Sequence, residues 1–124
     1  MNWSAVAAVA LGLAVMIGAF GAHALRGRLD AYSAGIYERA VFYHFVHALG
    51  MLIVSTLSKS SLLSPTGVSW VCGLLLAGIV LFCGSLYTLA ITGVRTWGAV
   101  TPFGGLAFIA GWFLLAFLLV RGPR

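Results

Sequence analysis

Long apolar stretches separated by short polar patches dominate the pattern of this chain. Four stretches contain no Asp, Glu, Lys or Arg: residues 1–25, 40–58, 60–94 and 96–120. A helix needs about 20 apolar residues to cross the hydrocarbon core of a bilayer, and each stretch has that length or nearly so. The apolar residues run continuously instead of alternating with period two, which favours helices over the strands of a membrane barrel.

The pattern therefore predicts an all-α integral membrane protein, an antiparallel bundle of four transmembrane helices. We expect a single transmembrane domain over residues 1–124, with spans at about 3–25, 40–58, 68–92 and 102–120. An interfacial connector is expected at 26–39, where Leu29, Tyr32 and Ile36 recur at helical spacing among charged residues. Short connections between antiparallel spans place both termini on one side of the membrane.

Local signals mark several helix ends. Pro65 suits the start of the third span, and Thr92-Gly93 is expected to end it. Thr101-Pro102 resembles an N-cap followed by a first-turn proline. The charges flanking the spans are nearly balanced between the two sides. The first span has no charged side chain before it, which favours connectors inside and termini outside.

Composition supports a membrane protein and excludes other classes. Hydrophobic residues make up 62% of the chain and charged residues 7%, with a mean hydropathy of +1.10. The net charge of +5 comes from Lys and Arg at span ends, so no basic face is predicted for nucleic acid. The lipid bilayer is the expected partner, in the inner membrane of a bacterium, with multiple spans. Residues 1–25 are interpreted as a retained span, because no Lys or Arg precedes the long apolar run.

Polar residues within the spans gather toward one leaflet. In an antiparallel bundle, the end of span 1, the start of span 2 and the end of span 3 lie at the same depth, whereas the other leaflet is almost wholly apolar. The polar residues there are His23, His44, His47, Tyr87, Thr88, Thr92 and Thr101. We expect at least two of the His and Tyr side chains to share a hydrogen-bond network, with Arg39 or Arg95 closing it at the interface.

The intramembrane histidines leave three interpretations open. His44 and His47 are three positions apart, on one helix face, and ionisable residues at such depth often mark function. They could form structural hydrogen bonds, bind a metal, haem, quinone or other ligand, or relay protons. They are the candidate metal ligands, but a zinc site wants further donors. Only His23, Tyr87 or Glu38 could supply such a donor nearby, and Glu38 lies on the wrong face relative to His47.

Small residues form ridges on the first and last spans. Such ridges let helices approach closely in membranes, and the partner is a helix of the same chain or of a second copy. The predicted packing residues are Ala14, Gly18 and Ala22 on the first span, and Gly104, Ala107 and Gly111 on the last.

Catalysis has little support in the sequence. The two acidic residues, Asp30 and Glu38, both lie in the connector, a thin basis for acid–base chemistry. Gly84-Ser85 lacks the surroundings of a nucleophile elbow, and no cofactor is predicted. The leading hypothesis is therefore a non-enzymatic membrane protein that self-associates or docks onto a larger complex. The alternative is a ligand-binding site built on the intramembrane histidines.

Four sequence blocks in order resemble the YgdD-like proteins. The blocks are Gly18–Leu25, Tyr43-His44 with His47-Ala48-Leu49, Phe82–Tyr87, and Thr101–Phe108 with Gly111-Trp112. That family consists of small, uncharacterised four-helix inner-membrane proteins with a mitochondrial counterpart in eukaryotes. The resemblance implies the fold and the membrane location, and it implies no activity.

Overall fold

A computed structural model describes residues 1–123 of the chain, and its regular structure there is entirely helical. The elements in order are α1 (Trp3–His23), α2 (Ala31–Thr56), α3 (Pro65–Gly78), the π-helical turn η1 (Ile79–Cys83), α4 (Gly84–Thr92), the 3₁₀ turn η2 (Arg95–Ala99) and α5 (Thr101–Arg121). Because α3, η1 and α4 follow one another without a break, they form one span. Four helical segments are long and apolar enough to cross a membrane, which confirms the predicted all-α, four-span architecture.

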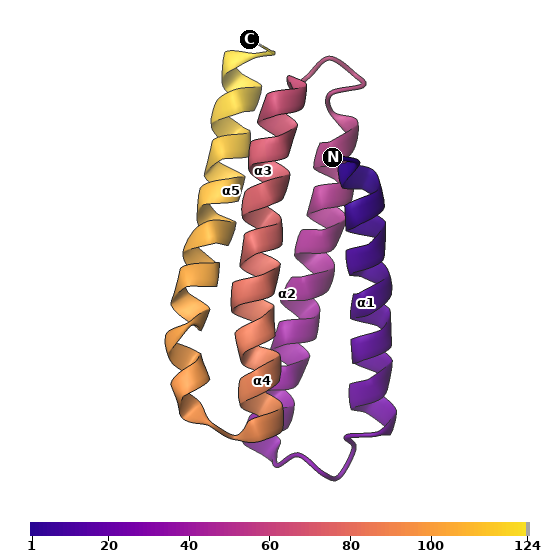
Figure 1. The fold of residues 1–124 in the computed structure, drawn as a ribbon, viewed down its shortest axis with the longest axis vertical. Helices are drawn as coiled ribbons and strands as arrows, with labels where there is room; N and C mark the ends of the chain where they lie inside the picture. Colours follow the sequence, from indigo (N-terminus) through magenta and orange to yellow (C-terminus); the bar gives the residue numbers. More distant parts are fainter. Residues whose placement is uncertain (124) are drawn as a thin grey trace.

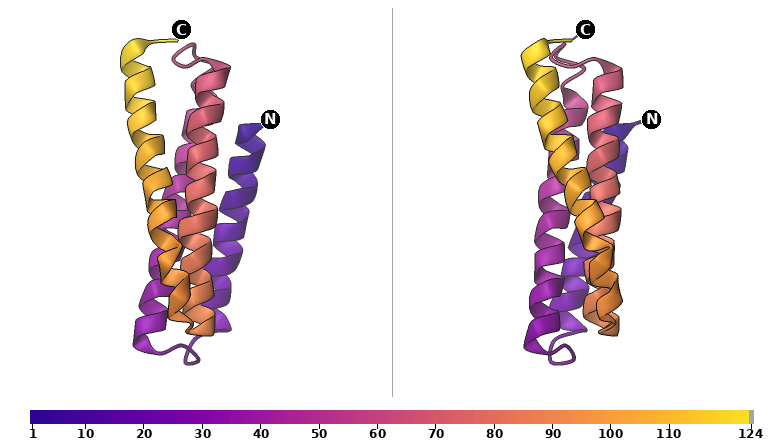
Figure 2. Two further views of the ribbon diagram at one scale, coloured as in Figure 1. Left: turned by 60° about the vertical axis from the view of Figure 1, so that its left-hand side comes forward. Right: turned by 90° about the vertical axis from the view of Figure 1, so that its left-hand side faces the viewer.

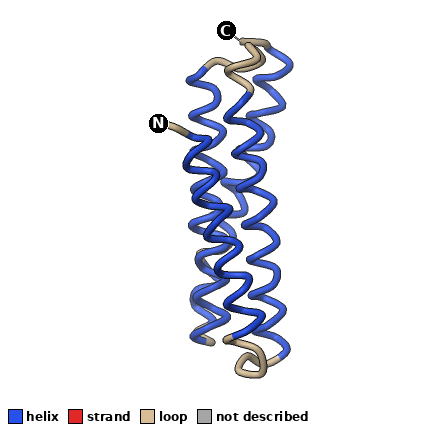
Figure 3. Tube along the Cα trace, turned by 90° about the vertical axis from the view of Figure 1, so that its right-hand side faces the viewer, coloured by secondary structure: helices blue, strands red, loops and turns tan. Residues whose placement is uncertain are grey.

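The four spans lie side by side in a staggered row (Figures 1 and 2). The central members are α2 and the α3–η1–α4 span, with α1 packed on α2 and α5 packed on α3 and η1. Loops occupy only the two ends of the bundle (Figure 3). Both termini lie at the end that also holds the loop between α2 and α3 (Figure 1), as the antiparallel arrangement requires.

Side-chain caps explain where the helices begin. The side chains of Asn2, Asp30 and Ser64 accept hydrogen bonds from backbone N–H groups of the first turns of α1, α2 and α3. The Ser33 backbone N–H, which donates to the Asp30 carboxylate, holds the pKa of that group below its usual value. Pro65 occupies the first turn of α3, and Gly93 ends α4 with a φ of 71°. Both were expected from the sequence.

The first connection is shorter than expected. The first helix ends at His23 instead of near residue 25, and α2 begins at Ala31, inside the expected connector 26–39. The physical reason is the Asp30 cap, which starts the helix immediately after the tight turn at Gly27, whose φ is +79°. The 26 residues of α2 span about 39 Å at 1.5 Å per residue. That length exceeds the bilayer core, so the first turns of α2 extend into the headgroup region.

The predicted cap at Thr101 is wrong. Thr101 is the first residue of α5, no side chain caps that helix, and the Thr101 hydroxyl is 2.6 Å from the Ser85 hydroxyl on α4. A hydroxyl that lies against a neighbouring helix finds its partner there and leaves the helix end uncapped. Ser85 and Thr101 therefore tie α4 to α5.

Small residues on the outer helices face the central helices of the same chain. Ala14 is fully buried on the face that α1 packs against α2. A Cβ added at Gly104 would lie 2.2 Å from the Phe82 backbone nitrogen, and one at Gly111 would lie 2.9 Å from a Leu75 methyl carbon. Gly18 lies beside Val41, Ala107 is half-buried and Ala22 is exposed. The predicted ridges are thus largely used for packing within the chain.

Candidate functional site

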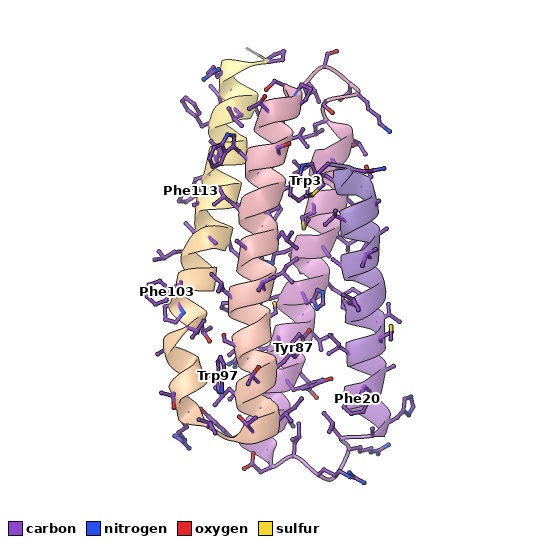
Figure 4. All side chains as sticks on the ribbon, in the orientation of Figure 1. Trp3, Phe20, Tyr87, Trp97, Phe103 and Phe113 are labelled. Atoms are coloured by element: carbon purple, nitrogen blue, oxygen red, sulfur yellow. The ribbon has the colours of Figure 1, made fainter. Side chains whose placement is uncertain are left out.

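A hydrogen bond between His44 of α2 and Tyr87 of α4 is the main polar contact of the predicted leaflet. His44 Nδ1 lies 2.9 Å from the Tyr87 hydroxyl, and His44 is 4% exposed. Tyr87 lies in the lower half of the bundle, toward the connections at that end (Figure 4). The expectation that two of the singled-out His and Tyr side chains share a hydrogen bond is met by this pair.

The same pair also reaches α1. His44 lies near the backbone of Ala10 of α1, and its Nε2 is buried and makes no hydrogen bond. With the ring hydrogen on Nε2, Nδ1 accepts from the Tyr87 hydroxyl. Tyr37 packs its ring 5.4 Å from that of Tyr87 and donates its hydroxyl to the Ile17 carbonyl of α1. These side chains therefore link α1, α2 and α4.

His47 has different surroundings. Its Nδ1–H donates to the Tyr43 carbonyl one turn earlier in α2, at 2.8 Å, so Nε2 is left as an acceptor. The ring stacks on Phe108 of α5 with centroids 3.5 Å apart, and the Trp112 ring is 5.8 Å away. Phe82 of η1 completes this aromatic cluster through its contacts with Tyr43 and Phe108.

The two histidines consequently do not form one site. Residues three apart on a helix differ by about 60° around its axis, which is enough for one to face α4 and the other α5. The structure places His44 against Tyr87 and His47 against Phe108. The expected common face is divided between two neighbouring helices, so a ligand bridging both rings is not supported.

The remaining candidates lie outside these contacts. His23, Glu38 and Arg39 are exposed, and the guanidinium of Arg95 lies 5.1 Å from the centre of the Tyr32 ring. Arg95 therefore ties η2 to the start of α2 and does not close the histidine network, contrary to expectation. Within residues 1–123, no group of three or more His, Cys, Asp or Glu side chains is placed to hold a metal ion.

Sequence reasoning missed polar contacts at the opposite end of the bundle. Ser4 of α1 and Ser55 of α2 bring their hydroxyls to 2.8 Å, and Trp3 Nε1 donates to the Ser69 hydroxyl of α3 at 3.1 Å. The expectation of a plain apolar leaflet there is wrong. Serines also bond to their own helix, as Ser55 does to the Leu52 carbonyl. Their spacing in the sequence therefore gave no sign of interhelical pairing.

Chemically, most of this arrangement is suited to holding helices together. The hydroxyls of Ser85 and Thr101, and the His44–Tyr87 pair, satisfy one another across helices. Both cysteines, Cys72 and Cys83, are buried free thiols within the apolar core. Two ring nitrogens make no hydrogen bond among the described residues: the buried Nε2 of His44 and Nε2 of His47.

Comparison with known proteins places the chain among uncharacterised membrane proteins. Residues 17–105 match a family described as "Protein of unknown function (DUF423)". The chain is 46% identical over 103 residues to a UPF0382 membrane protein of Staphylococcus haemolyticus, covering 83% of this chain and 82% of the relative. It is 43% identical over 111 residues to the UPF0382 membrane protein YwdK of Bacillus subtilis, covering 88% of each. No solved structure matches.

Proposed function

The chain belongs to the DUF423 family, and we propose that it is a non-enzymatic protein of the bacterial inner membrane that self-associates or docks onto a larger membrane complex. The observation that supports this role is the use of buried polar groups. His44 pairs with Tyr87, and Ser85 pairs with Thr101, across helices inside the bundle. These groups do not line an open reaction site. A partner protein would therefore contact the outer surface of the bundle.

The outer face of α1 is the favoured surface for association. Only 17% of the most apolar part of α1 is buried, the same share as in the last span, against 44% for α2. Apolar exposure alone is ordinary in lipid, but Ala5, Ala8 and Gly12 are all exposed small residues, and a Cβ at Gly12 would meet nothing within 4 Å. These three residues form a small stripe beside the bulkier exposed Val9 and Met16, and such a stripe allows another helix to approach closely.

The outer face of α5 offers a natural contrast. Phe103 and Phe113 project from it away from the bundle (Figure 4), and they are 64% and 73% exposed. Bulky side chains of this kind suit contact with acyl chains, which adapt to any shape. The proposal therefore places helix–helix association at α1 and lipid contact at α5.

Cysteine cross-linking in native membranes tests this proposal. We expect Gly12→Cys, at the middle of α1, to form covalent dimers or a cross-link to a co-purifying protein. Ile109→Cys, exposed near the middle of α5, is the depth-matched control and should stay monomeric. The native thiols are buried and give no background. If neither variant cross-links and tagged protein is recovered from native membranes alone, association is contradicted.

A ligand at His47 is the second candidate, favoured by its unpaired Nε2. A histidine that binds a metal often donates its other ring N–H to a backbone carbonyl, and His47 does so to Tyr43. Such a site would use His47 alone, with the remaining donors supplied from outside the chain. A Soret band or a stoichiometric metal in purified protein, lost in His47→Ala and kept in His44→Ala, would support it and count against a purely associative role.

The narrower likeness to YgdD-like proteins and their mitochondrial counterpart remains part of this proposal. So does the orientation with connectors inside and termini outside. The four spans and a family described as being of unknown function support the likeness. The lack of a charged side chain before the first span supports the orientation.

A further inference from the structure

A groove lies between the end of α1 and the start of α2, beneath the connection that joins them. Its volume is about 530 Å³, within the range of ligand pockets in proteins. Gly18, Tyr37 and Val41 line its apolar part, and Arg26 and Glu38 are also among its lining residues. Its lining residues belong to the end of α1, the connection and the start of α2, a part of the chain that lies at the bottom of Figure 1. Of its lining residues, Tyr37 alone takes part in the contacts around His44, and the proposed association surface does not use the groove.

The glycines of α1 let a fixed tyrosine pack closely and form one wall of this groove. Gly18 and Gly21 contribute only backbone, and a Cβ at Gly21 would lie 2.2 Å from a Tyr37 ring carbon. The Tyr37 ring is buried and held by its hydrogen bond to the Ile17 carbonyl. Ala22, which is exposed, lines the groove without filling it. The groove is therefore a built feature of the α1–α2 contact.

The polarity of the groove changes with depth. Its apolar end lies at Gly18 and Val41, and its other end lies at Ala34 and the connection beyond His23. From Val41 to Ala34 the rise along α2 is about 10 Å, which brings the groove from the acyl region to the membrane surface. An elongated molecule with an apolar tail and a polar head matches this gradient. Bilayer phospholipid is the occupant always present at that position.

The charges select the headgroup. Arg26 and Glu38 have opposite signs and line the same groove, and within residues 1–123 neither side chain makes an ion pair. A guanidinium binds phosphate well, and a carboxylate accepts from an ammonium N–H. We propose that this groove binds one phospholipid with a phosphoethanolamine headgroup, its phosphate on Arg26 and its ammonium on Glu38. Phosphocholine has no N–H to donate, and phosphoglycerol has no cation.

Native mass spectrometry with dioleoyl phosphatidylethanolamine, phosphatidylcholine and phosphatidylglycerol tests this binding site. We expect the wild type to retain phosphatidylethanolamine about tenfold more strongly than phosphatidylcholine, since one charge-assisted hydrogen bond is worth about that factor. Glu38→Gln should remove this preference, and Arg26→Gln should weaken the binding of all three lipids. Arg28→Gln, a neighbouring cation outside the groove lining, is the control and should keep the preference.

A variant that fills the groove distinguishes a loss of lipid binding from damage to the fold. Ala22→Leu adds bulk at an exposed lining position, and it should lower phosphatidylethanolamine retention while leaving the melting temperature unchanged. Equal retention of phosphatidylethanolamine and phosphatidylcholine would overturn the proposal. A preference for phosphatidylglycerol that is unaffected by Glu38→Gln would also overturn the proposal. That result would reflect only the general attraction of an anionic lipid to the basic residues at this end of the bundle. Neither result bears on association through α1, which the cysteine variants test separately.

Discussion

Replacing Gly104 with alanine is expected to lower the free energy of unfolding by about 3 kcal/mol, at the upper end of ordinary overpacking costs. A Cβ at this position would lie 2.2 Å from the backbone nitrogen of Phe82 and 2.7 Å from its Cα. Because backbone atoms in the π-helical turn η1 cannot rotate away, α5 must separate from the neighbouring span. Thermal unfolding in detergent and titration with a denaturing detergent measure the loss.

Gly105→Ala is the matched control for this substitution. It lies next in α5, and a Cβ there would be 3.8 Å from a Phe82 ring carbon, an ordinary contact. Alanine is also the better helix former, so this variant should be as stable as wild type or slightly more so. Equal stability of the Gly104 and Gly105 variants would show that α5 does not pack against η1 as described.

Breaking the His44–Tyr87 hydrogen bond is expected to cost about 2 kcal/mol of the free energy of unfolding, since one buried polar group is left without its partner. Tyr87→Phe leaves His44 Nδ1 unpaired, and His44→Leu leaves the Tyr87 hydroxyl unpaired. In a double-mutant cycle the two changes should couple by about 1 kcal/mol, the scale measured for hydrogen bonds between membrane helices. The double variant should then be more stable than the sum of the single losses predicts.

Tyr43→Phe serves as the control for the loss of a tyrosine hydroxyl. Tyr43 contacts His47 through its ring and its carbonyl, and its hydroxyl makes no hydrogen bond among the described residues. The stability of this variant should match that of wild type. A coupling near zero between His44 and Tyr87, with both single variants no less stable than Tyr43→Phe, would mean that the two side chains are not paired in the membrane.

The apolar stretches and helix-end residues alone determined most of the fold. Charges and unpaired backbone groups are costly in lipid whatever the neighbouring helices are. The order of residues along the chain is therefore enough to predict four spans. The cap at Ser64 with Pro65 and the left-handed Gly93 act through their own turns. The sequence also predicted that His44 and Tyr87 lie in the same leaflet, because the depth of a residue follows from its position along a span.

Only the tertiary structure decided which faces meet. Small residues look alike in the sequence whether they pack inside, as Ala14 does, or face outward, as Gly12 does. No local sequence pattern predicted the π-helical turn at 79–83. This turn lies where the backbone atoms of Phe82 contact Gly104. His44 and His47 share a helix face by spacing, yet they contact different helices. An angular difference of about 60° is resolved only when the positions of both neighbours are known.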